Sequence, residues 1–484
     1  MKLLSAVFIF LFGIGVLASG QRNVSPIDME EMLDASTLDV EVVQDWHVVK
    51  GKVPTRQKYM TINVGELWPG QNYRVPVRFI VPADRKAKGF HLTGGHQLAG
   101  IEKDSEIKGV GVELLIGGVG LVYTIIQNPN LWGQAELGVE MEKRFIETLK
   151  PRYTVKLWGW PASLCRAVTA AYSETDYFEQ GKIAMSGGSK NGASPSMALI
   201  HDERMTAIHA SRSPIWDSPL RMCDEQAWET LNISDQEFAH REGLNEALAN
   251  KITRHAFRGG FFGPDFNLDA LAKGHSWKDL QGFTHRMADH VFISRNLEDL
   301  RTRNVDLYFH PGTNDFVCFD VPWGGKHHSD IPVYLETNLG HGKNRPHPAL
   351  ERNQKNLSAF LLNHFFDGVK PLLESPETYF SIEGTTLTVT VRFDPGSQSE
   401  SGRIWWMYDR GPEGSGAYLG ELFSDDQWKD MAFDSKTNTW AIEIELDGKA
   451  SYIDFFSNHR KTIDYGSVKY PTYISSPYTR ISLR

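Results

Sequence analysis

The residues best suited to chemistry lie in one short run, Gly187-Gly-Ser189-Lys-Asn-Gly192. An apolar segment, 181–186, precedes this run, and 193–200 can continue as a helix. A tight strand-to-helix turn of this kind is a nucleophile elbow, which pushes a serine hydroxyl out of a sheet. The strict pattern has glycine two residues after the serine, whereas this chain has glycine at the third position, Gly192. The context therefore predicts that Ser189 is a nucleophile.

A serine hydroxyl needs a base, and that base needs an acid to orient it. Downstream, an apolar segment ending at His310 is followed by Asp315, and one ending at Thr337 is followed by His341. Parallel sheets gather their functional groups beyond the carboxyl ends of their strands. The order serine, acid, histidine thus predicts a triad of Ser189, Asp315 and His341.

An acyl-transfer site also needs donors for the oxyanion. The backbone N–H of Lys190 follows the nucleophile and begins the predicted helix, so it is one candidate. The second comes from Gly94 and Gly95, because paired glycines after an early strand can turn an N–H into the site. An ordinary glycine turn is the alternative for this pair.

Other residues compete for these roles. Ser186 is a rival nucleophile within the preceding strand, and Asp320 is a substitute acid. Three further histidines are substitutes for the base: His327, His328 and His347. Together with Asp330 and His341 these histidines could suggest a metal, but they lack the spacing of a helical His-Glu-x-x-His site. We therefore expect no metal and no cofactor.

The elements that would position these residues alternate between short apolar strands and amphipathic helices. We expect strands over residues 75–81, 89–92, 119–127, 181–186, 207–211, 305–310 and 333–337. We expect helices over 135–150, 162–174, 193–200 and 351–366. This alternation predicts an α/β fold with a mostly parallel sheet covered on both faces, over residues 70–370.

Three regions flank or interrupt that pattern. Residues 21–69 are polar and acidic and read as an N-terminal arm. Residues 217–300 form a long, mainly helical insertion, interpreted as a lid or cap, with a plain peripheral excursion as the alternative. Residues 377–484 alternate with period two, which predicts an antiparallel, Ig-like β-sandwich.

The N-terminus predicts export. Lys2, an apolar run over 6–17 and the small residues 18–20 describe a secretory signal peptide over residues 1–20, with an uncleaved anchor as the alternative. We therefore expect a secreted or periplasmic protein. No later stretch is long and apolar enough to span a bilayer.

The composition limits the classes of partner and the number of disulfides that the chain can have. The 484 residues carry a net charge of −9, so the chain offers no basic footprint for nucleic acid. Its three cysteines, Cys165, Cys223 and Cys318, allow one disulfide at most, and the sequence leaves their pairing open.

The site segments resemble those of the PhoPQ-activated pathogenicity-related family, which are secreted or periplasmic α/β-hydrolase-like proteins. The similarity lies in Gly187-x-Ser189-Lys190-x-Gly192, in Gln127-Asn-Pro-Asn130 and in the 161–171 segment around Arg166. It continues at Gly312-Thr-Asn-Asp315-Phe316 with Asp320, and at Leu339-Gly-His341. The Ser-x-Asn-Gly run is also similar to glucuronoyl esterases. Both resemblances imply a serine hydrolase.

We therefore expect an exported hydrolase that cleaves a carboxylic ester, or an amide, of a small-molecule, glycan or peptide substrate. The alternatives are a glucuronoyl-esterase-like or peptidase activity, or a non-catalytic glycan-binding protein. In the last case four tryptophans, Trp405, Trp406, Trp428 and Trp440, would hold the glycan rather than fill the sandwich core.

Overall fold

The computed structural model describes residues 25–129, 132–245, 266–342 and 346–484. The expected signal peptide therefore lies outside the described residues. Among those residues, no helix is long and apolar enough to cross a membrane.

An eight-stranded sheet runs through the first part of the chain in the order β1-β2-β3-β5-β4-β6-β7-β8. Strands β4 to β8 pair in parallel, whereas β1, β2, β3 and β5 form antiparallel neighbours. The bounds are β1 (Glu41–Val49), β2 (Thr55–Trp68), β3 (Gln71–Pro82), β4 (Ala87–Thr93), β5 (Gly120–Thr124), β6 (Phe178–Gly188), β7 (Ala207–Ser211) and β8 (Asp306–His310). The predicted α/β class with a mostly parallel sheet is confirmed.

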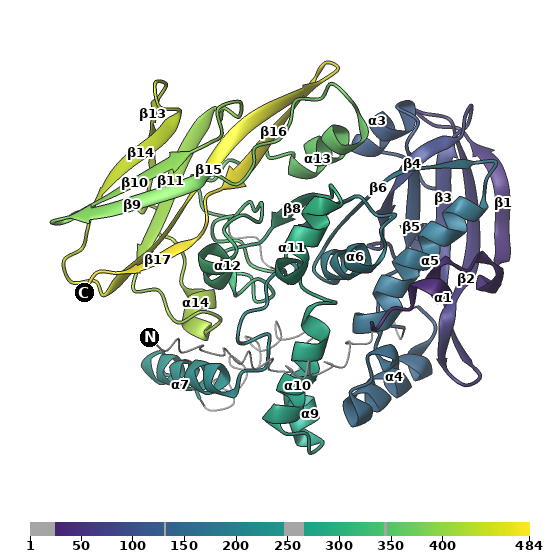
Figure 1. Ribbon diagram of the computed structural model, residues 1–484, viewed down its shortest axis with the longest axis horizontal. Coiled ribbons are helices and arrows are strands. Elements are labelled where there is room, and N and C mark those ends of the chain that lie inside the picture. Colours follow the sequence, from purple (N-terminus) through teal and green to yellow (C-terminus); the bar gives the residue numbers. More distant parts are fainter. Residues whose placement is uncertain (1–24, 130–131, 246–265, 343–345) are drawn as a thin grey trace, which may run out of the picture.

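Helices cover both faces of this sheet (Figure 1). On one face lie α5 (Trp160–Ser173), α6 (Lys190–His201) and α11 (Ile293–Thr302), whose apolar side chains share a core with Leu92 and Met185. On the other face lie α3 (Val110–Ile116) and α13 (Asn356–Phe365), which pack with Leu121 and Ala184. Both faces are thus buried, as parallel strands require.

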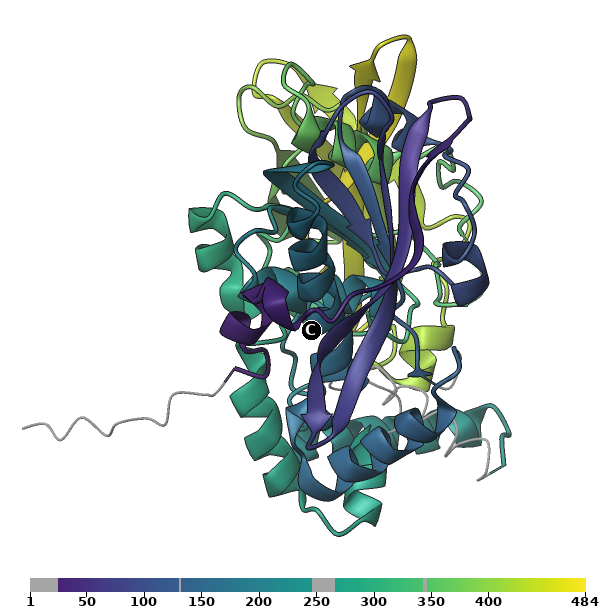
Figure 2. The ribbon, with the colours of Figure 1, turned by 90° about the vertical axis from the view of Figure 1, so that its right-hand side faces the viewer.

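The expected N-terminal arm is instead part of the sheet. Residues 41–68 form β1 and β2, which Figure 2 shows at the near edge of the sheet. Ahead of them, α1 (Met29–Leu33) is held by the buried Arg166, whose guanidinium donates to the carbonyl oxygens of Glu31 and Asp34 at 2.9 and 2.8 Å. The outer strand β1 is largely exposed, so its residues lack the apolar alternation that identifies a strand.

The segment expected as a strand at 333–337 is not one. It makes only two isolated parallel bridges with the chain around β8, through Val333 and Glu336. Its other side faces the C-terminal part of the chain, where Ser475 N–H donates to the Val333 carbonyl oxygen at 2.8 Å. Because its hydrogen bonds are divided between two sheets, no continuous ladder forms.

The C-terminal part consists of two antiparallel sheets, ordered β13-β14-β10-β9 and β12-β11-β15-β16, with β17 paired to β15. The strands of the first sheet are β9 (Glu377–Glu383), β10 (Thr386–Arg392), β13 (Ala432–Asp434) and β14 (Thr439–Glu445). Those of the second are β11 (Ser401–Tyr408), β12 (Trp428–Asp430), β15 (Tyr452–Tyr465), β16 (Val468–Ser475) and β17 (Thr479–Ser482). Val389 and Ile444 of one sheet share a core with Ile404 and Phe455 of the other, so the sheets form a sandwich.

The remaining helices lie between these two parts or beside them. The 217–300 insertion contains α7 (Glu225–Arg241), α9 (Phe266–Ala272), α10 (Trp277–Ala288) and most of α11, while residues 246–265 lie outside the described part. The insertion contacts the C-terminal part, because the Gly416 N–H of α14 (Gly416–Gly420) donates to Asp235 of α7 at 2.6 Å. The others are α2 (Leu98–Ile101), α4 (Ala135–Thr148) and α12 (Val321–His327).

Candidate active site

Ser189 lies at the turn between β6 and α6 in a strained backbone conformation. Its φ and ψ are 58° and −127°, a region that non-glycine residues rarely adopt. Its N–H donates to the Ser211 carbonyl oxygen at the end of β7 at 2.8 Å, which fixes the turn against the neighbouring strand. This is the strand-to-helix turn that the sequence pattern predicts.

The two flanking glycines make the turn possible. A Cβ at Gly187 would lie 1.9 Å from the Asn191 carbonyl oxygen, and one at Gly192 would lie 3.0 Å from the Gly187 carbonyl oxygen. Gly192, at the third position after the serine, is therefore the glycine that packs against the end of β6. The second position is free to carry Asn191.

Asp315 and His341 meet through two short contacts. Nδ1 of His341 lies 3.0 and 3.1 Å from the two carboxylate oxygens of Asp315. Asp315 is fully buried and also accepts the Val317 N–H at 2.7 Å, whereas His341 keeps 23% of its side chain exposed. A carboxylate held in this way fixes the imidazole tautomer with its proton on Nδ1. Nε2 is then left as the free base.

The chain at the end of β7 links the serine to the histidine. Ser211 accepts the Ser189 N–H, and the next residue, Arg212, donates from Nη1 to the His341 carbonyl oxygen at 3.3 Å. Ser189 and His341 are therefore each hydrogen-bonded to one of the two neighbouring residues Ser211 and Arg212. Among the described residues, Ser189 Oγ makes no hydrogen bond. Catalytic hydrogen bonds often tighten only when substrate binds.

The candidate oxyanion donors differ in placement. Lys190 is the first residue of α6, and its N–H meets no acceptor within the described part of the chain. Gly95 is exposed, and a Cβ there would lie 3.7 Å from the Asn191 side chain, so the loop after β4 reaches the elbow. Gly94 is buried beneath Ile126, whose side chain fills the Cβ position at 2.3 Å. Gly94 therefore supports the loop, and Gly95 is the member of the pair next to the elbow.

The Lys190 side chain reaches Gln127 and the ring of Trp160. Its ammonium donates to the Gln127 side-chain oxygen and lies 5.9 Å from the centre of the Trp160 ring. Burial lowers the pKa of this ammonium below its usual value. The side chain is thus held by Gln127 and Trp160, while the backbone N–H remains a candidate oxyanion donor.

The competing residues have other partners. Ser186 is buried and bonded to His91 Nε2 at 2.8 Å. Asp320 is buried and paired with Arg221, whose Nη2 lies 2.8 Å away, and with Ser218.

The substitute bases are also engaged. His327 packs on Trp323 with ring centres 4.0 Å apart, His328 pairs with Asp217 at 3.3 Å, and His347 is bonded to the Ser424 carbonyl oxygen at 3.0 Å. No three metal-ligating side chains gather within the described ranges.

The sequence predicts no role for three residues that the structure places at the site. Arg212 contacts His341, the ring of Phe316 lies 4.7 Å from the His341 ring, and Asn191 holds a buried Oδ1 with no partner among the described residues. Arg212 directly follows a parallel strand, so the rule that located Asp315 could have located it as well. All three cysteines are buried, and no disulfide joins them in the described part of the chain.

Comparisons with known proteins give distant likenesses. No family model matches this chain, and no curated protein matches it, so membership of the PhoPQ-activated pathogenicity-related family is not shown. Acetyl xylan esterase 1 from Thermoanaerobacterium sp. JW/SL YS485 is 11% identical over 67% of this chain and 91% of its own, with a TM-score of 0.35.

Two glucuronoyl esterases, from Teredinibacter turnerae T7901 and Solibacter usitatus, are 15% and 18% identical with TM-scores of 0.27 and 0.26. Each likeness covers 37% of this chain. The chain spans about half the length of these two esterases, 46% and 52% respectively.

Proposed function

We propose that this protein is a serine hydrolase that cleaves a carboxylic ester through an acyl-enzyme. Ser189 is the nucleophile, His341 the general base and acid, and Asp315 the residue that orients the imidazole. The observation that supports the proposal is that two neighbouring residues, Ser211 and Arg212, are hydrogen-bonded to the strained Ser189 and to the carboxylate-held His341, respectively.

The reaction follows from these positions. Ser189 Oγ attacks the ester carbonyl carbon while its proton passes to His341 Nε2. The N–H groups of Lys190 and Gly95 stabilise the oxyanion of the tetrahedral intermediate, which collapses as His341 returns the proton to the departing alcohol. Water, activated by the same nitrogen, then releases the acid and restores the free serine.

The substrate class is part of the proposal. We expect esters rather than peptides, since nothing in the sequence reads as a binding site for a peptide terminus. The resemblance to the PhoPQ-activated pathogenicity-related family supports a serine hydrolase, and that to glucuronoyl esterases adds a glucuronate ester as the second candidate substrate.

The test uses the purified full chain with three substrates: p-nitrophenyl acetate, a methyl ester of 4-O-methyl-glucuronate and a peptide p-nitroanilide. Ser189→Ala should abolish hydrolysis of the preferred ester, whereas Ser186→Ala, which removes the rival hydroxyl, should keep it. If the folded Ser186→Ala variant loses activity while Ser189→Ala keeps it, the nucleophile is Ser186 and the proposal is wrong.

We also propose that residues 1–20 direct export and are removed. N-terminal sequencing of the protein recovered from the periplasm or the medium should begin at Gln21. A chain that retains Met1 in the cytoplasm would contradict this part of the proposal.

A further inference from the structure

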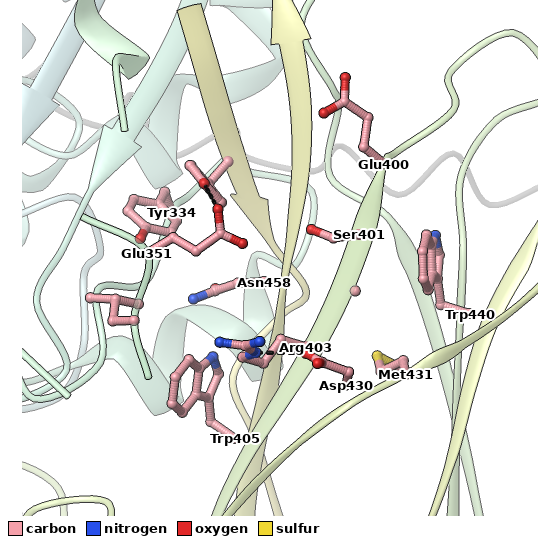
Figure 3. A pocket seen from close by; sticks show the side chains of 13 residues that line it. Tyr334, Glu351, Glu400, Ser401, Arg403, Trp405, Asp430, Met431, Trp440 and Asn458 are labelled. Atoms are coloured by element: carbon pink, nitrogen blue, oxygen red, sulfur yellow. Dashed lines mark hydrogen bonds and ion pairs between the residues drawn. The ribbon is translucent and has the colours of Figure 1, made fainter. Parts of the chain in front are cut away.

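A cavity of about 300 Å³ lies in the C-terminal part of the molecule, away from the candidate active site. Its walls come from β11, the neighbouring strands and the chain around Leu350 and Glu351 (Figure 3). None of Ser189, Asp315 and His341 lines it. Its volume is at the lower end of the range for small-molecule pockets.

Two indoles form apolar walls of this cavity. Trp405 is 1% exposed and packs in the core around the central sheet, whereas Trp440 is 8% exposed and packs in the core of the sandwich. Trp440 approaches closely because residue 402 is glycine, where a Cβ would lie 2.9 Å from the indole carbons. Because other side chains cover both indoles almost completely, they contribute only apolar edges to the cavity.

The charged side chains of the cavity are already paired. Arg403 Nε donates to Asp430 at 2.7 Å. Arg460 donates to Glu351 at 2.8 Å and to Glu400 at 3.2 Å. Three carboxylates thus share two cations, and the remaining lone pairs of the carboxylates can still accept hydroxyl protons.

Two donors in the same cavity lack acceptors. Trp405 Nε1 is buried and has no hydrogen-bond partner among the described residues. Arg403 donates from Nε and Nη1, to Asp430 and to the Ala349 carbonyl oxygen, while its Nη2 meets no acceptor in the described part of the chain. Figure 3 shows the Trp405 nitrogen on the side of the indole that faces Arg403. The buried Trp405 Nε1 without a partner costs free energy that a ligand oxygen would recover, whereas the Arg403 side chain keeps 23% of its surface exposed to water.

We propose that this cavity binds one neutral sugar residue of a glycan. A sugar hydroxyl both accepts and donates, so one oxygen can satisfy Trp405 Nε1 and Arg403 while its neighbours donate to Glu351 and Glu400. An anionic ligand is disfavoured, because the cavity carries more carboxylates than cations and each cation already has a partner. The site acts independently of the proposed hydrolysis.

The test measures binding of neutral disaccharides, cellobiose, xylobiose and laminaribiose, to the full-length Ser189→Ala protein by isothermal titration calorimetry. Glucuronic acid and inorganic phosphate are the anionic comparisons. We expect at least one neutral disaccharide to bind with a dissociation constant below about 10 mM, which is a weak single-site affinity. Neither anion should compete with it. Trp405→Phe keeps an aromatic ring, smaller than the indole, and removes the N–H. It should weaken binding about tenfold.

Trp406→Phe is the matched control, because Trp406 is the next residue of β11 and does not line the cavity. It should leave the affinity unchanged. Thermal unfolding should show both variants folded but with lowered melting temperatures, because each substitution removes part of a buried indole. The proposal is overturned if no neutral disaccharide binds, if an anion binds more tightly, or if the two variants weaken binding equally.

Discussion

His341 Nδ1 lies within 3.1 Å of both carboxylate oxygens of Asp315, and the carboxylate is fully buried. The imidazole is therefore held in one tautomer and one orientation. Both residues come from loops, and the isolated bridges between Gly312 and Glu336 and between Phe309 and Val333 fix these loops beside each other. The predictions below depend on this pair and on the turn that carries Ser189.

Replacing Asp315 with Asn should lower kcat by about 10³- to 10⁴-fold, because the amide favours the wrong imidazole tautomer. The measurement is ester hydrolysis between pH 6 and 9, with circular dichroism to verify folding. If the Asp315→Asn enzyme keeps more than a tenth of the activity, Asp315 is not the residue that orients His341.

Asp320 should behave in the opposite way. Its carboxylate neutralises the buried Arg221, so Asp320→Ala should lower the free energy of unfolding by about 3–5 kcal/mol. The folded fraction should keep kcat within about tenfold of the wild type. Urea unfolding and active-site-normalised kinetics measure the two effects. A loss of kcat without a loss of stability would make Asp320 the orienting acid.

Gly187→Ala should disrupt the nucleophile turn, because its Cβ would lie 1.9 Å from the Asn191 carbonyl oxygen. We expect soluble protein with activity reduced at least about 100-fold, or a marked loss of stability, since the backbone at the site must move. Gly100→Ala is the control, because its Cβ would meet nothing within 4 Å. Equal activity in the two variants contradicts the described turn.

The elbow was predictable because its requirements are local. An apolar strand and a helix flank the run that contains Gly187, Ser189 and Gly192. Each of the two glycines is needed because a Cβ there would collide with a backbone oxygen of the same turn. The site loops were predictable in position, since Asp315 follows a parallel strand.

What escaped prediction depends on distant partners. Residues 41–49 form an exposed edge strand, so their hydrogen bonding to β2 leaves no apolar pattern. Residues 333–337 look like a strand, yet Ser475 and Phe309 divide their hydrogen bonds. Arg212 could have been located as a site residue, because it follows a parallel strand, but its contact with His341 across 129 residues of sequence leaves no local pattern.

Acid should destabilise the protein through its buried histidines. His209 is buried beside Tyr308, with ring centres 5.2 Å apart, and burial lowers its pKa to about 3. Below pH 6.5 the unfolded chain therefore binds a proton that the folded protein does not, so stability is full above pH 6.5 and is lost as the pH falls toward 3.

His209→Phe keeps an aromatic ring and removes this proton. Between pH 6 and 4.5 the slope of the unfolding free energy against pH should fall by up to about 1.4 kcal/mol per pH unit. Urea titrations at several pH values measure it. An unchanged slope would mean that His209 is protonated in the folded state.

The most direct measurement of the central claim is covalent labelling by a fluorophosphonate, followed by peptide mapping of the folded, full-length protein. A serine activated by His341 attacks the phosphorus and keeps the adduct, whereas an ordinary serine does not. We predict a single stoichiometric adduct on Ser189, greatly slowed by Asp315→Asn and absent after heat unfolding. A folded protein that remains unlabelled at Ser189, or that is labelled equally well without Asp315, would contradict the account.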